Sequence, residues 1–306
     1  MPIEADTSLV VVGSIGRGEV TSGSDVDFMV VVNDDGAAEL AEKEIAAEVA
    51  RQGERADVRQ YVSDKLIELR LAPPSSEGPL GEVVLVSELC KNISKDPYTN
   101  QTLTRRMLLL LESASFGNEE AWTQSVEKVR DTYLGFGHKD GRPPRFFLND
   151  VFRYWRTLCV DYEGKMRDRG MAGWALRNAK LRTVRKMLFA SGLLPLLECH
   201  RFSADEISGF LATRLAMPAA DRVAAAFLEN GAAPQGGSAL AAYSTFLERL
   251  GDPDWRNELS SLPEQERATS SRWQEAKALG RTFEAGLMYL LYDTALAPTT
   301  RAYSIF

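Results

Sequence analysis

Cysteine is scarce in this sequence, with Cys90, Cys159 and Cys199 as its three examples in 306 residues. An odd number at such wide spacing argues against a disulfide framework and indicates a reducing compartment. Cys199 is followed by His200, but no second Cys/His pair stands at the spacing of zinc ligands. A structural zinc site is therefore not expected.

Long apolar runs are also missing. Runs such as residues 107–111 are far shorter than the roughly 20 residues that a membrane-spanning helix needs. Residues 1–7 hold two acids and no basic residue ahead of the first apolar run, which is unlike a signal peptide. We therefore expect a cytoplasmic protein.

The composition is that of an ordinary globular protein, with 44% hydrophobic and 26% charged residues and a length that allows two domains. The net charge is −7, yet residues 139–186 hold thirteen Lys/Arg and five Asp/Glu, a local net charge of +8. One basic stretch on an acidic protein favours a specific anion site, for a triphosphate or a structured RNA, over sliding along duplexes. The alternative is a solvated helix face.

The first ninety residues alternate between strand and helix signals. Short apolar runs predict strands over residues 9–12, 26–32, 56–62 and 82–86, and helical patterns cover residues 37–51 and 64–71. This alternation is typical of a small sheet with helices packed on it.

After residue 100, helical patterns dominate. They cover residues 103–113, 119–134, 147–167, 173–191, 204–216, 219–230, 239–250 and 264–295. The predicted fold class is α+β, with a small mixed-sheet domain over residues 1–100 and an all-helical domain over residues 101–306. The cleft between two such domains is the default place for a ligand.

Two carboxylates carry the chemistry of the first domain. Asp25 and Asp27 stand at the head of the strand over residues 26–32, so both project from one face, separated by roughly 6.6 Å. Carboxylate oxygens are the ligands that Mg²⁺ prefers. A pair of such ions can hold the attacking and leaving oxygens of a displacement at phosphorus.

A third carboxylate is expected from a neighbouring strand. Asp57 is the candidate because it lies in the middle of the strand over residues 56–62, with Glu54 and Asp64 as the alternatives. If that strand adjoins the strand of Asp25 and Asp27, Asp57 also accepts the proton of an incoming hydroxyl.

A glycine-punctuated turn follows the first strand. Gly13 lets backbone N–H groups approach a phosphate, Ser14 offers a hydroxyl, and Arg17 can pair with phosphate oxygens. Glu19 is expected to orient Arg17 or to cap the turn. Ser24, which directly precedes Asp25, is counted among the nucleotide-binding candidates.

The segment from Gly13 to Asp27 resembles the signature of DNA polymerase β-like nucleotidyltransferases, in which Gly-Ser is followed some ten residues later by Asp-x-Asp. Its fuller form, Gly-Ser-x-Gly-Arg-Gly-Glu with Ser-Asp-x-Asp, is similar to bacterial protein uridylyl- and adenylyltransferases. It is also similar to minimal nucleotidyltransferases of toxin–antitoxin and antiviral defence systems.

The resemblance implies that Gly13 and Ser14 bind a nucleoside triphosphate and that Asp25, Asp27 and Asp57 bind Mg²⁺, or Mn²⁺ in its place. The implied reaction moves a nucleoside monophosphate to an acceptor, RNA, protein or a small molecule, with release of pyrophosphate. In this superfamily a helical domain commonly closes the cleft, and its basic residues hold the triphosphate. Here the candidates are Arg153, Arg156, Lys180 and Arg185, with surface charge as the alternative for each.

Two other functions share these features. One is a toxin or antiviral-defence nucleotidyltransferase controlled by a partner protein, which has the same chemistry. The other is a nucleotide-binding regulator without turnover, which intact metal carboxylates disfavour because binding alone does not require them.

Overall fold

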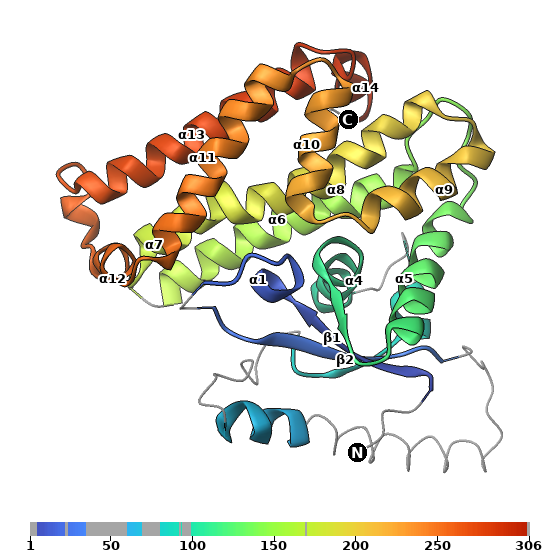
Figure 1. The fold of residues 1–306 in the computed structure, drawn as a ribbon, viewed down its shortest axis with the longest axis horizontal. Coiled ribbons are helices and arrows are strands. Elements are labelled where there is room, and N and C mark those ends of the chain that lie inside the picture. Colours follow the sequence, from blue (N-terminus) through green and yellow to red (C-terminus); the bar gives the residue numbers. More distant parts are fainter. Residues whose placement is uncertain are drawn as a thin grey trace. The chain divides into compact units, whose positions relative to one another are not determined.

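In a computed structural model of the chain, the described residues are 5–21, 24–34, 60–68, 80–91, 93, 99–168 and 170–304. The chain divides into two compact units, one made of Met1–Val20 and Ser24–Phe136, the other of Thr21–Gly23 and Gly137–Phe306. Among the described residues, the first unit combines a small sheet with helices and the second is helical (Figure 1). This confirms the α+β class.

The sheet is mixed and has the strand order β3-β2-β1-β4. β1 (Thr7–Val12) pairs antiparallel with β2 (Asp27–Val32). β3 (Val83–Leu85) pairs parallel with β2, and β4 (Ala114–Phe116) pairs antiparallel with β1. Three of the four strands lie where apolar, β-branched runs predict them; β4, which is three residues long, was not predicted.

One face of the sheet is covered by the helix over residues 60–68. Val62 and Leu66 lie one helical turn apart and pack against Phe28 and Val30 of β2. The predicted strand over residues 56–62 is therefore wrong for its described part, residues 60–62. Because Val58 and Val62 are four apart, their spacing fits both a strand and a helix.

The opposite face is covered by α4 (Asn100–Glu112) and α5 (Glu119–Leu134), which both contact β1. Val10 and Met29 are fully buried on this face. A domain boundary at residue 100 would remove both helices from the sheet that they cover, so the first compact unit extends to Phe136 instead. The first unit also contains the short helices α1 (Gly13–Gly16) and α3 (Val86–Cys90).

The second unit contains a long buried helix. α8 (Lys186–Glu198) is apolar around most of its circumference, which is typical of a helix enclosed by others. It is reached from α7 (Trp174–Lys180) through a π-helical turn, Leu181–Arg185, so the helix predicted over residues 173–191 is present but not regular. The other helices are α6 (Arg145–Asp168), α9 (Ala204–Leu215), α10 (Ala219–Glu229), α11 (Ala233–Gly251), α12 (Pro253–Ser261), α13 (Ser271–Tyr292) and α14 (Ala297–Ser304), with 3-10 turns at Cys199–Arg201 and Glu264–Glu266. In the described part of the chain, no helix combines the length and the apolar character that crossing a membrane requires.

A buried carboxyl group stands at the end of α8. The Glu198 side chain is 1% exposed and accepts a hydrogen bond of 3.2 Å from Asn230. Arg214 and Arg201 lie 3.7 and 3.9 Å from its two oxygens, and both arginines also pair with Glu229. Burial raises the pKa of Glu198 to about 7; Glu229 adds to this rise, and Arg214, Arg201 and Asn230 oppose it.

This pKa predicts a pH-dependent stability. Because the folded pKa of Glu198 lies above the unfolded value of 4.5, the folded state holds the proton more tightly between pH 4.5 and about 7. The contribution of this group to the free energy of unfolding has its largest value below pH 4.5. It decreases as the pH rises to 7, by up to about 1.4 kcal/mol per pH unit. We expect the free energy of unfolding in urea to decline between pH 5 and pH 7.5, and Glu198→Gln to reduce this decline by about 2 kcal/mol. An equal decline in both proteins would contradict the assignment.

Candidate active site

The two halves of the Gly-Ser and Asp-x-Asp signature meet at one end of the sheet. In the antiparallel register Val12, the last residue of β1, is the partner of Asp27, which begins β2, and Gly13 follows Val12 directly. Gly13 has a φ of +69°, and a Cβ atom there would lie 3.2 Å from Oδ2 of Asp27. A glycine is required both by this backbone conformation and by the approach of the carboxylate.

The second carboxylate lies two residues earlier. Val26 packs on the face of the sheet that carries Phe28, and side chains alternate along an extended chain. Asp27, which begins β2 and pairs with Val12, therefore projects to the other face, the one covered by α4 and α5, and Asp25 precedes the strand. Asp25 is exposed and Asp27 is half-buried, so both carboxylates are accessible to a ligand.

The turn after β1 forms the short helix α1, which contacts α4. The amide of Glu19 donates a 2.8 Å hydrogen bond to the Ser14 carbonyl, which closes the turn. A Cβ atom on Gly16 would lie 2.0 Å from the Glu112 carbonyl oxygen, so another side chain at this position would force α1 away from α4. The Gly-x-x-Gly spacing therefore has two separate steric causes.

Arg17 is held between two carboxylates. Its Nε donates to Glu19 at 2.6 Å, and its Nη1 donates to Glu112, the last residue of α4. The three side chains are at most 9% exposed. The prediction that Glu19 orients Arg17 is confirmed. A direct contact between Arg17 and a phosphate stays a prediction, since the guanidinium already forms ion pairs with Glu19 and Glu112.

Among the described residues, the carboxylates of the candidate site are ligands of the kind that a hard divalent cation prefers. Asp27 offers carboxylate oxygens beside the Gly13 turn, and Asp25, two residues earlier in the chain, is exposed. Within the described ranges, no cluster of three or more His, Cys, Asp or Glu side chains could hold a metal ion. The predicted third ligand, Asp57, lies outside the described residues, and so does the helix predicted over residues 37–51.

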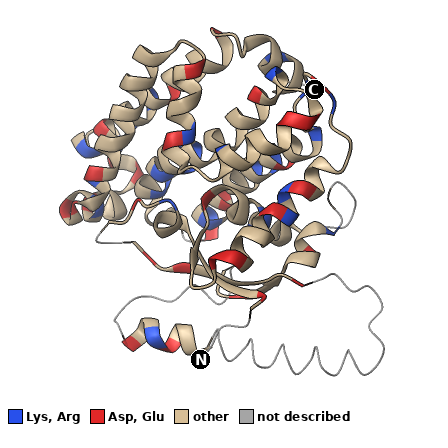
Figure 2. Cartoon of the chain, turned by 45° about the vertical axis from the view of Figure 1, so that its right-hand side comes forward, with Lys and Arg blue, Asp and Glu red and all other residues tan. Residues whose placement is uncertain are grey.

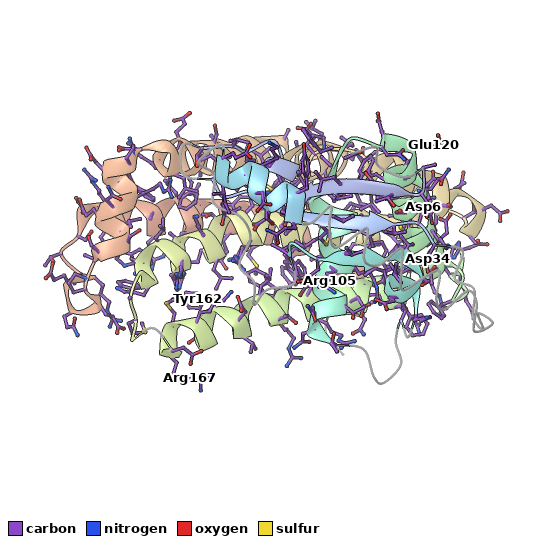
Figure 3. The ribbon with its side chains drawn as sticks, turned by 90° about the horizontal axis from the view of Figure 1, so that it is seen from below. Asp6, Asp34, Arg105, Glu120, Tyr162 and Arg167 are labelled. Carbon is purple, nitrogen blue, oxygen red and sulfur yellow. The ribbon has the colours of Figure 1, made fainter. Side chains whose placement is uncertain are left out.

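Other acids of the sheet lie at its far end. Asp6 and Asp34, which Figure 3 labels, flank the start of β1 and the end of β2, where the amide of Asn33 donates to the Asp6 carbonyl at 2.8 Å. The carboxylate of Asp34 accepts a hydrogen bond from the Ser87 amide at 2.8 Å and so caps α3. These carboxylates stabilise the fold and are remote along the strands from the Asp25 and Asp27 pair.

The basic candidates of the helical unit differ in their surroundings. Arg153 lies 3.5 Å from the carboxylate of Asp150, which is fully buried. Arg156 and Arg185 are exposed, and Lys180 is half-buried. Figure 2 shows basic and acidic residues interspersed along the helices of this unit, so exposure alone does not mark an anion site.

Two observations concern the neighbourhood of Arg185. It belongs to the π-helical turn, a distortion that is frequent at functional sites. Burial raises the pKa of Cys159 on α6, and the charges of Lys186 and Arg185 oppose this rise, which places both cations near α6. Contact of Arg153, Arg156, Lys180 or Arg185 with a nucleotide stays a prediction.

The small mixed sheet, with the Gly-Ser turn beside Asp27, is consistent with the resemblance to polymerase β-like nucleotidyltransferases. In agreement, residues 2–77 match the nucleotidyltransferase domain family. The chain thus carries a nucleotidyltransferase domain, and a nucleotide is the substrate that this domain implies. No curated protein matches the chain.

Sequence reasoning missed Glu112. It follows a leucine-rich run at the end of α4, where its sequence neighbours give no sign of a site, and it is 95 residues from its partner Arg17. Among the described residues, its contacts with Arg17 and Gly16 link α4 to the signature turn.

Proposed function

We propose that this protein is a divalent-cation-dependent nucleotidyltransferase, which moves a nucleoside monophosphate from a nucleoside triphosphate to an acceptor and releases pyrophosphate. The observation that carries the proposal is the position of Gly13 beside Asp27, where a Cβ atom would meet the carboxylate at 3.2 Å. This proximity supports the proposal because it brings the turn proposed to bind phosphate beside a carboxylate proposed to bind metal.

Each residue of the site has a role in this proposal. The backbone of Gly13 and the hydroxyl of Ser14 bind the triphosphate, with Ser24 beside them. Asp25 and Asp27 hold Mg²⁺, or Mn²⁺ in its place, together with Asp57. When bound, the ions neutralise phosphate charge and stabilise the developing charge on the oxygens that attack and leave phosphorus.

The reaction forms one bond and breaks one. An oxygen of the acceptor attacks the α-phosphorus, the bond to the bridging oxygen breaks, and pyrophosphate leaves with the electron pair. The proton of the attacking hydroxyl passes to a carboxylate of the site, for which Asp57 is the candidate. Arg153, Arg156, Lys180 and Arg185 are the candidate cations for the charge of the triphosphate.

Accessible carboxylates favour turnover over binding alone. Asp25 is exposed and Asp27 is half-buried, so both are open to a cation that a non-catalytic nucleotide-binding regulator does not require. A toxin or defence nucleotidyltransferase under the control of a partner protein uses the same chemistry. Identifying the acceptor and the partner protein would distinguish it from other nucleotidyltransferases. RNA and protein are the acceptors that we propose to test first.

The test uses the purified full chain with Mg²⁺ and each of four α-labelled nucleoside triphosphates, in the presence of total RNA or cell lysate. We expect pyrophosphate release, and label on an acceptor, with at least one nucleotide. Replacing Mg²⁺ by excess chelator should stop both signals. Absence of pyrophosphate with every nucleotide and acceptor contradicts the proposal.

A further inference from the structure

The signature turn is too short to hold itself in place. α1 has four residues, and a single helical turn in water is unstable because nucleation fixes several backbone angles for one hydrogen bond. The position of Gly13 and Ser14 relative to Asp27 must therefore depend on contacts that α1 makes with other elements. α1 and α4 are in contact, and both are labelled in Figure 1.

The end of α4 supplies these contacts through its main chain. The Glu112 carbonyl approaches Gly16 so closely that a Cβ atom would lie 2.0 Å from it. The Val11 carbonyl of β1 lies 2.9 Å from the same Cβ position. α1 is thus in contact with both the end of α4 and the strand that precedes it.

The same residue also supplies a side-chain contact. The carboxylate of Glu112 accepts a hydrogen bond from Nη1 of Arg17, while Glu19 accepts one from Nε. The Glu112 side chain is 5% exposed and the Arg17 side chain 9%, so solvent screens this ion pair little. Removing one partner of a buried ion pair lowers the free energy of unfolding more than removing one partner of an exposed pair, because the remaining charge stays poorly solvated.

We propose that Glu112 is a positioning residue of the nucleotide site. Acting through Arg17, it holds α1 so that the Gly13–Ser14 turn stays beside Asp27 and presents its phosphate-binding groups. This inference rests on the proposed function, because its kinetic consequence requires that the turn binds a triphosphate. Glu112 itself does not touch the nucleotide in this proposal.

The test compares Glu112→Gln, Arg17→Met and the double variant with the wild type. We expect the KM for the nucleotide to rise about tenfold in each single variant while kcat changes less than about twofold, since a misplaced turn weakens nucleotide binding in both ground and transition states. If Glu112 acts through Arg17, the double variant should be no worse than Arg17→Met. Glu119→Gln, which changes an exposed acid at the start of α5, is the matched control and should leave KM unchanged.

A second measurement needs no activity. Hydrogen exchange of the amides of Arg17, Gly18 and Glu19, which donate within the turn, should become about tenfold faster in Glu112→Gln than in the Glu119→Gln control. Unchanged exchange, or KM effects of the two single variants that multiply in the double variant, overturns the proposal. If the wild type turns over no nucleotide, the proposed function fails, and the exchange measurement still decides whether Glu112 holds the turn.

Discussion

The Asp25→Asn/Asp27→Asn double variant is expected to lose at least about 10³-fold of the nucleotidyl-transfer rate, which corresponds to about 4 kcal/mol of transition-state stabilisation. Asn keeps the size of each side chain but removes the negative charge that holds a divalent cation. The fold should be retained, because Asp25 is exposed and exposed carboxylates seldom carry much stability. Pyrophosphate release under saturating nucleotide measures the rate, and thermal unfolding checks the fold.

The matched control is Asp34→Asn, which changes an aspartate just after the other end of β2. Asn keeps an acceptor oxygen for the Ser87 amide but loses the charge that strengthens this hydrogen bond, so the variant should lower the melting temperature slightly and leave the transfer rate within about twofold. Turnover in the double variant at the wild-type rate would discard the site. The single variants, each measured alone, show which carboxylate contributes more.

Arg106→Ala is expected to lower the free energy of unfolding by about 3 kcal/mol or more, the largest stability effect that we expect from a single substitution. Arg106 on α4 is fully buried. Its guanidinium donates to the carbonyl of Leu89 at 2.7 Å, to that of Lys91 at 3.5 Å and to the Tyr133 hydroxyl at 3.2 Å. It thereby satisfies carbonyls at the end of α3 that the helix itself leaves without donors.

Urea unfolding followed by circular dichroism measures this effect. Arg106→Met separates its two parts, because Met fills most of the space but still leaves the carbonyls without donors; we expect it to be about 2 kcal/mol less stable than the wild type. Arg249→Ala is the matched control, since Arg249 forms an exposed ion pair with Glu275 at 2.8 Å that is worth at most about 1 kcal/mol. If Arg106→Ala lowers the free energy of unfolding no more than Arg249→Ala does, the hydrogen bonds of the buried arginine contribute nothing to stability.

The elements that sequence predicts best here are those with a local cause. α5 spans Glu119–Leu134 as predicted, because Asn118 accepts a hydrogen bond from the Ala121 amide at one end and Gly135 follows the other. The apolar runs of β1 and β2 likewise lie where the sequence predicts strands, and the two strands pair with each other.

Where local patterns are ambiguous, tertiary packing decides. Residues 60–62 are helical because Val62 and Leu66 together cover Phe28 and Val30, which no alternation in the sequence reveals. β4 has three residues and exists through its pairing with β1, and the π-helical turn at Leu181–Arg185 interrupts a helix that sequence reads as regular. The helix over residues 60–68 and the strand β4 thus depend on partners distant in the chain.

The sequence by itself determined the candidate site of the first unit: the glycine turn and the two aspartates all lie within residues 13–27, and short segments carry their own conformational preferences. The tertiary structure alone decided that α4 and α5 belong with the sheet, and that Glu112 meets Arg17 across 95 residues. The reason is physical. Backbone propensity and side-chain spacing act over a few residues, whereas burial selects contacts by shape and charge among segments that the sequence keeps far apart.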